Sequence, residues 1–496
     1  MASYLSALGV LFQPVNFIMM YICSLVGCVL GAIPGLSGGL GITLILPLTF
    51  ALNTNLSFAM LLGMYVGGVS GSFIAAVLVG IPGSAASIGT CYDGYPMTQK
   101  GKAARALSIG ITGSFIGTMV SIIVATLCST FIADIALKLG PWEYFSLCLM
   151  AITMVIGLSN GSIFKGLLAA FFGLWLSTIG SDMVTNQLRF TFHNTSLYGG
   201  INVVCLLMGT FALQQVASSY AKNNLTMPEV ETGSLKGFGL SFKDFKANLK
   251  VIITSLFIGL WIGFLPGMGS GISNLIAYGQ AKKMSKHPEK FGTGIDEGIW
   301  ATEVANNAGV GGAIIPMIAL GIPGDATTVL LMSAMTIHGL QAGPMFIKNN
   351  PLLANLIFAT VLVSAILIFI TEIFTKRWFP LLLKAPYHYL YSAILMICFL
   401  GAYSASTSMF SVYLVLVFGA VGILMEFFKM PGTPLMLAFI LGSKIESYFR
   451  MGCSYAKGDM TSFLTRPISL IFILIAVYSV IGPVVQKALK RKKVNA

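Results

Sequence analysis

Charged residues are scarce in this chain of 496 residues. Lys and Arg number 29 and Asp and Glu 16, which makes 9% of the sequence, against about 25% in a typical soluble domain. Hydrophobic residues make up 56%, and the mean hydropathy is +0.87. This composition excludes a soluble enzyme, a nucleic-acid-binding domain and a disordered chain, because each of these needs far more polar surface. It predicts a polytopic membrane protein.

Charge is also missing from the start of the chain, where the first charged residue is Asp93. A cleavable signal peptide begins with a basic region, so we expect the N-terminus to be the mature one. The net charge of +13 comes from loops between apolar runs and from a basic tail at residues 487–493. In a membrane protein such charge is typical of cytoplasmic loops, and it does not indicate nucleic acid as a partner.

Motifs for metals, nucleotides and covalent catalysis are absent. The eight Cys form no C-x-x-C pair and the four His have no metal-ligand spacing, so we expect no metal centre and no redox role. There is no G-x-x-x-x-G-K-[ST] motif, which argues against an ATPase. No nucleophile with a matched base is recognisable either. We therefore expect a protein that is not an enzyme and has no cofactor beyond Na⁺ or H⁺ as a coupling ion.

Long apolar runs are abundant. A helix needs about 20 mostly apolar residues to cross a bilayer, and the clearest runs are residues 106–133, 351–371 and 467–486. They are continuously apolar, unlike the alternating strands of a β-barrel. We predict an all-α polytopic membrane protein with about 12 transmembrane helices plus broken or re-entrant helices. Glu372 falls near the end of a span and is expected to be interfacial.

The same pair of Pro-Gly motifs occurs twice in the sequence. The first copy of each motif contains Pro34 and Pro82, and the second copy contains Pro266, 232 positions after Pro34, and Pro323, 241 positions after Pro82. The most polar stretch of the chain lies between the two copies. A recurrence of this kind indicates an internal duplication.

The duplication divides the chain into three predicted parts. These are an N-terminal transmembrane repeat of residues 1–220, a polar linker of residues 221–247, and a C-terminal transmembrane repeat of residues 248–496 that ends in the basic tail. An odd number of spans in each repeat would give inverted repeats and an even number parallel ones. Both arrangements stay open, because short apolar segments leave the number of spans undecided.

The Pro-Gly pairs predict a substrate site. Pro has no amide N–H and Gly accepts any φ, so each pair breaks a helix, and the freed backbone groups need protein or a water-lined cavity around them. Broken helices at matching places in two repeats are typical of secondary transporters, in which half-helix N-termini face an anion. For any single Pro-Gly pair, the alternative is that it only kinks the helix or lets a neighbouring helix pack closely. A Ser or Thr side chain can likewise bond to the backbone of its own helix instead of to a ligand. The predicted substrate-binding residues are Pro34, Gly35, Ser37, Gly38, Pro82, Gly83, Ser84, Ser87, Pro266, Gly267, Gly269, Ser270, Asn306, Asn307, Pro323, Gly324, Thr327 and Thr328.

Three residues are predicted to couple a cation: Glu303, Asn307 and Asp325. Ionisable residues inside a membrane are functional by default, and carboxylate and amide oxygens suit Na⁺ or a proton relay. Residues 251–280 and 302–337 contain no Lys, Arg or His, so an anionic substrate there needs N–H groups, hydroxyls and a co-bound cation. The alternatives are that Glu303 is an interfacial residue and that Asp325 caps the helix that follows it.

Several motifs resemble those of the large permease subunit of tripartite tricarboxylate transporters. They are Gly31–Gly39, Ile81–Ser84, Asp93–Pro96, Phe291–Asn307 and His338–Pro344. The resemblance extends over nearly the whole chain. It implies a multi-pass subunit of the bacterial inner membrane that works with a periplasmic substrate-binding protein and a small membrane subunit. It also implies the import of carboxylates with an ion gradient.

The resulting hypothesis is an importer of a tricarboxylate, dicarboxylate or related organic acid, coupled to Na⁺ or H⁺ and working by alternating access. One alternative is a stand-alone ion-coupled anion transporter that needs no binding protein. A channel is another alternative, and it would give downhill flux that is insensitive to cation gradients.

Overall fold

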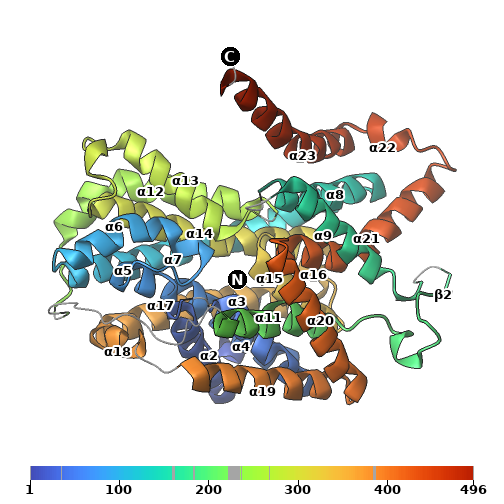
Figure 1. The fold of residues 1–496 in the computed structure, drawn as a ribbon, viewed down its shortest axis with the longest axis horizontal. Coiled ribbons are helices and arrows are strands. Elements are labelled where there is room, and N and C mark those ends of the chain that lie inside the picture. Colours follow the sequence, from blue (N-terminus) through green and yellow to red (C-terminus); the bar gives the residue numbers. More distant parts are fainter. Residues whose placement is uncertain are drawn as a thin grey trace.

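The structure is a computed structural model that describes residues 2–34, 36–158, 162–182, 185–221, 235, 237–266, 268–383 and 387–494. Helices make up nearly all of it (Figure 1), and the only strands among these residues are β1 (Gly180–Ser181) and β2 (Leu188–Arg189), which pair antiparallel. The prediction of an all-α protein is confirmed.

The first half of the chain contains eleven α-helices among its described residues. They are α1 (Ala2–Leu11), α2 (Pro14–Ala32), α3 (Gly38–Ile45), α4 (Thr54–Gly71), α5 (Phe73–Leu78), α6 (Ile88–Gln99), α7 (Ala103–Ala136), α8 (Pro141–Leu158), α9 (Ile163–Ser177), α10 (Val203–Leu207) and α11 (Gln214–Ala221).

The second half contains twelve more α-helices among its described residues. They are α12 (Phe242–Phe264), α13 (Gly269–Met284), α14 (Asp296–Leu320), α15 (Ala326–Ile337), α16 (Pro344–Asn349), α17 (Pro351–Thr375), α18 (Phe379–Leu383), α19 (Tyr387–Ser406), α20 (Met409–Phe427), α21 (Gly432–Tyr455), α22 (Ser462–Thr465) and α23 (Pro467–Val494). Short 3-10 turns are η1 (Leu46–Ala51), η2 (Ala85–Ser87), η3 (Thr195–Leu197), η5 (Pro288–Lys290) and η6 (Lys376–Trp378), and η4 (Met208–Leu213) is a π-helical turn.

Seven helical stretches of the described residues are long and apolar enough to cross a membrane. They are Pro14–Ala32, Thr54–Leu78, Ala103–Ala136, Val203–Ala221, Phe242–Phe264, Pro351–Leu383 and Met409–Phe427. Shorter apolar helices accompany them, including α3, α8, α9 and α15. The polytopic membrane class is thereby confirmed, while the total of about 12 spans stays a prediction.

Glycines let two pairs of helices pack closely. A Cβ atom on Gly31 of α2 would lie 2.2 Å from the carbonyl oxygen of Gly68 in α4, and one on Gly263 of α12 would lie 2.6 Å from that of Gly309 in α14. Small residues at such crossings are the usual means of helix association in lipid. The two crossings are related by the same shifts of 232 and 241 positions as the Pro-Gly motifs. This relationship supports the proposed duplication.

The predicted linker of residues 221–247 lies largely outside the described residues, since 222–234 and 236 are not among them. Its last part is helical, because α12 begins at Phe242. Ser241 and Asp244 form a capping box there, in which each side chain accepts the backbone N–H of the other. The C-terminal repeat therefore starts its first helix earlier than residue 248, and the remaining boundaries stay a prediction.

Candidate functional site

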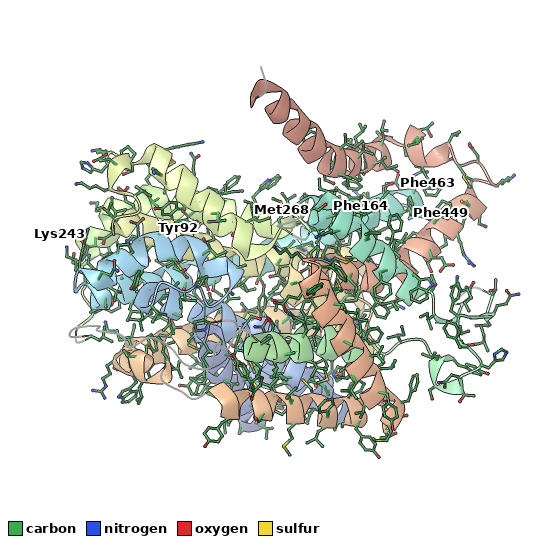
Figure 2. The ribbon with its side chains drawn as sticks, viewed as in Figure 1. Tyr92, Phe164, Lys243, Met268, Phe449 and Phe463 are labelled. Carbon is green, nitrogen blue, oxygen red and sulfur yellow. The ribbon has the colours of Figure 1, made fainter. Side chains whose placement is uncertain are left out.

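One cavity of about 600 Å³ borders all four predicted helix breaks. Ser37, Ser84, Gly269 and Asp325 each contribute to its lining. These four residues stand at or directly before the first residues of α3, η2, α13 and α15. Met268 also lines the cavity, and Figure 2 shows it near the middle of the molecule. Segments separated by up to 288 positions in the sequence thus meet around one space.

Serine side chains cap two of these helical segments. The Ser37 hydroxyl accepts the backbone N–H of Leu40 at 3.2 Å, and the Ser84 hydroxyl accepts that of Ala86 at 3.3 Å. Pro34 and Pro82 follow the ends of α2, at Ala32, and of α5, at Leu78, and neither proline can donate the backbone hydrogen bond that would continue its helix. The N-terminal ends of α3 and η2 are consequently held at the cavity.

Asp325 caps α15 and joins it to the other half of the chain. Its Oδ1 accepts the backbone N–H of Thr328 at 2.7 Å, and its Oδ2 accepts the phenol O–H of Tyr65 at 2.7 Å. A Cβ atom on Gly269, the first residue of α13, would lie 3.3 Å from the Asp325 Cβ. The capping alternative for Asp325 is what the structure shows, and a role in cation binding stays a proposal.

The predicted substrate-binding residues divide into three groups. Those that line the cavity are Ser37, Gly38, Ser84, Gly269 and Thr327. The described residues that are not part of its lining are Pro34, Pro82, Gly83, Ser87, Pro266, Asn306, Asn307, Pro323, Gly324 and Thr328. Gly35, Gly267 and the side chain of Ser270 lie outside the described part of the structure.

The glycines of two breaks pack against backbone instead of facing the cavity. A Cβ on Gly83 would lie 2.3 Å from the carbonyl oxygen of Gly31, and one on Gly324 would lie 2.5 Å from that of Gly263. No larger side chain fits at either place without moving a helix. These glycines therefore hold the broken segments against α2 and α12, which is a positioning role.

Glu303 and Asn307 form a separate polar centre where α14 meets α6 and α7. Glu303 is fully buried; it accepts hydrogen bonds from the hydroxyls of Thr90, at 2.5 Å, and Ser114, at 3.3 Å. The Asn307 amide donates to the Ser114 hydroxyl at 2.9 Å. Protein surrounds the Glu303 carboxylate, and whether the residue lies at the depth of the membrane interface stays open. Asp325 lines the cavity and Glu303 does not, so the three predicted cation-coupling residues fall at two places.

Sequence reasoning missed two features of this region. The first is Tyr65, which lines the cavity. The shift of 241 positions aligns Tyr65 with Asn306, a predicted site residue, so the duplication could have identified Tyr65. The wall formed by Phe211, Gln214 and Gln215 next to the π-helical turn η4 has no counterpart in the duplicated motifs. No pattern in the sequence pointed to it.

Broken helices that meet at a central cavity in an apolar helical protein are typical of membrane transporters. Residues 17–437 match the tripartite tricarboxylate transporter TctA family, and the chain belongs to that family. The resemblance recognised in the sequence is confirmed. The family is one of transporters, and membership makes this chain the large, multi-pass membrane subunit of such a system.

Two proteins of Agrobacterium vitis are similar to the chain. The uncharacterized 52.8 kDa protein in the TAR-I ttuC' 3' region is 33% identical over 456 residues, which cover 92% of this chain and 90% of the relative. The uncharacterized protein in the TAR-II ttuC' 3' region is 33% identical over 211 residues, which cover 42% of this chain and 87% of the relative. No solved structure matches the chain.

Proposed function

We propose that this chain is the permease of a binding-protein-dependent importer that carries a carboxylate together with Na⁺ or H⁺ across the bacterial inner membrane. The observation that carries the proposal is the meeting of all four breaks at one cavity. Helix N-termini present unpaired N–H groups and a partial positive charge, which favour an anion. Alternating exposure of this cavity to the two sides of the membrane is the proposed mechanism.

The chemistry of the cavity fits a small organic acid. None of the described lining residues is Lys, Arg or His, and Asp325 is the one acid among them. Backbone N–H groups and the hydroxyls of Ser37, Ser84 and Thr327 are therefore the groups available to a carboxylate. A volume of about 600 Å³ falls within the range of about 300–1,000 Å³ that is usual for small-molecule sites. Tricarboxylates, dicarboxylates and related acids all suit this lining.

A co-bound cation follows from the charge of the site. Binding an anion next to Asp325 without added positive charge would place like charges together in a medium of low dielectric constant. Glu303 and Asn307 offer carboxylate and amide groups for the coupling ion at the second polar centre. The membrane potential supplies about 2.3 kcal/mol per charge per 100 mV. Moving more cations than substrate charges would therefore concentrate the carboxylate.

Membership in a tripartite family supports two protein partners, a periplasmic substrate-binding protein and a small membrane subunit. The test is uptake into proteoliposomes that contain both membrane subunits. Radiolabelled citrate, succinate and benzoate are offered with and without the binding protein, under a sodium gradient and under a proton gradient. We expect accumulation that requires the binding protein and one of the two gradients.

Two outcomes of this experiment would favour the alternatives. Gradient-driven accumulation that is unchanged without the binding protein would indicate a stand-alone anion transporter. Downhill flux that is insensitive to both gradients would indicate a channel. Either result would contradict the proposed binding-protein-dependent importer.

A further inference from the structure

Glu372 is a buried carboxylate that the proposed substrate site does not use. It lies near the end of α17, is 2% exposed, and accepts hydrogen bonds from the Ser70 hydroxyl at 3.2 Å and the Cys28 thiol at 3.5 Å. The side chain is enclosed by protein, since its bonding partners come from α2 and α4, and its interfacial depth stays a prediction. A carboxylate at such a place requires either a positive partner or neutralisation.

Glu372 forms no ion pair with any described residue. The next basic residue on the same helical face is Lys376 of η6, but its ammonium group bonds to Ser108 at 2.9 Å and to the carbonyl oxygen of Gly237. Arg377 lies over the ring of Trp378 instead. Within the described part of the chain, the groups of α2 and α4 that bond to the carboxylate are the Cys28 thiol and the Ser70 hydroxyl, and neither is cationic.

The serines that bond to Glu372 and to Glu303 line the same small pocket. Ser70 of α4 and Ser114 of α7 both contribute to its lining. Ser70 donates to Glu372 and Ser114 donates to Glu303. Each buried carboxylate is therefore held by a hydroxyl and not by a cation.

We propose that Glu372 is a proton-binding site of this transporter. The inference rests on the proposed ion-coupled function and adds a second ionic site to it. A proton suits Glu372 better than Na⁺, because a hard metal cation prefers several oxygen ligands and the partners here are one hydroxyl and one thiol. Transfer of one proton from a hydronium ion breaks an O–H bond of that ion, forms the O–H bond of the Glu372 carboxylic acid and releases one water molecule.

Infrared pH titration of the purified protein in lipid tests the site without any substrate. The C=O stretch of a protonated buried carboxyl group should be present in the unaltered protein and lost in Glu372→Gln. In Glu372→Asp it should shift in frequency, which shows that a folded variant still carries the group. The matched control is Glu143→Gln, because Glu143 is also buried but pairs with Arg466 at 3.2 Å. An undiminished signal in Glu372→Gln would overturn the proposal.

Uptake measurements separate this inference from the proposed function. Glu372→Gln should lose the acceleration that an inward proton gradient gives, while Glu143→Gln retains it. Full acceleration in Glu372→Gln would also overturn the proton site. If the unaltered protein takes up none of the tested carboxylates, the proposed substrate class is wrong, and the infrared result still decides whether Glu372 binds a proton.

Discussion

The phenol of Tyr65 donates a 2.7 Å hydrogen bond to the carboxylate of Asp325, which lies 260 positions away in the sequence. Tyr65 belongs to α4 in the proposed N-terminal repeat, and Asp325 caps α15 in the proposed C-terminal repeat. Both residues line the cavity. The bond therefore ties a helix of one repeat to a break of the other at the place where substrate is proposed to bind.

Removing the hydroxyl of Tyr65 should destabilise the protein at the helix break before α15. Tyr65→Phe leaves the ring in place but withdraws one donor from a charged acceptor, and we expect a loss of about 1–3 kcal/mol in the free energy of unfolding. Chemical denaturation in detergent micelles measures this change. Tyr21→Phe is the control, because Tyr21 bonds to the hydroxyl of Thr371, which is uncharged. An equal or smaller effect of Tyr65→Phe would contradict the structural role of the bond.

Glycine at the crossing of α2 and α4 should be indispensable. In Gly31→Ala the new methyl group would meet the carbonyl oxygen of Gly68 at 2.2 Å, so the helices must separate at a cost of about 1–3 kcal/mol. We expect a lower unfolding temperature, and a similar fall for Gly263→Ala. Gly9→Ala serves as control, since nothing lies within 4 Å of the added atom. Equal stability of all three variants would show that the crossing is looser than described.

Asn307 should be needed for transport but not for insertion into the membrane. Asn307→Ala removes the bonds to Ser114 and to the backbone of Glu303, and so disturbs the proposed ion site. We expect proteoliposome uptake to be abolished while the amount of protein in the membrane is unchanged. Asn355→Ala, which loses a bond to Ser3 near the start of the chain, should transport normally. Uptake at the normal rate in Asn307→Ala would count against the proposed ion site.

Cavity residues should react with water-soluble thiol reagents. Thr327 lines the cavity, whereas Ser333 on the same helix is 2% exposed. In a background without native cysteines, Thr327→Cys should be modified rapidly, and a transported carboxylate should slow the reaction. Ser333→Cys should react slowly with or without substrate. If substrate fails to protect Thr327→Cys, the cavity is not where the carboxylate binds.

Asp93 should hold the loop between α13 and α14. Its Oδ1 accepts the backbone N–H groups of Gly292, Gly294 and Ile295 at 2.7–3.1 Å, and Oδ2 accepts the phenol of Tyr278. Asp93→Asn removes the charge that strengthens these bonds, each worth about 1.5–3 kcal/mol.

Limited proteolysis measures the release of this loop. Trypsin should cut after the lysines at 286 and 290 several times faster in Asp93→Asn. Asp459→Asn, which changes an exposed loop carboxylate bonded to Thr461, should leave that rate unchanged. Identical cleavage in both variants would show that the carboxylate charge does not secure the loop.

The candidate site was only partly predictable. The Pro-Gly breaks were recognisable because Pro and Gly act on the backbone locally, and residues beside all four breaks reach the cavity. The partners of Glu303 were not recognisable, because Thr90 and Ser114 come from helices whose packing no local pattern specifies. The burial of Glu372 was not recognisable for the same reason: the number of residues from a span end does not tell whether lipid, water or protein surrounds a side chain.

Composition and periodic apolar runs alone determined that this chain is a helical membrane protein with interrupted helices, because hydrophobic length and backbone chemistry act within single segments. The recurring motifs also sufficed to recognise its family. Tertiary structure decided which interruptions line the cavity, which only pack, and that Glu303 and Glu372 are buried. Those relationships depend on contacts between segments hundreds of residues apart, and these contacts arise only when the helices pack.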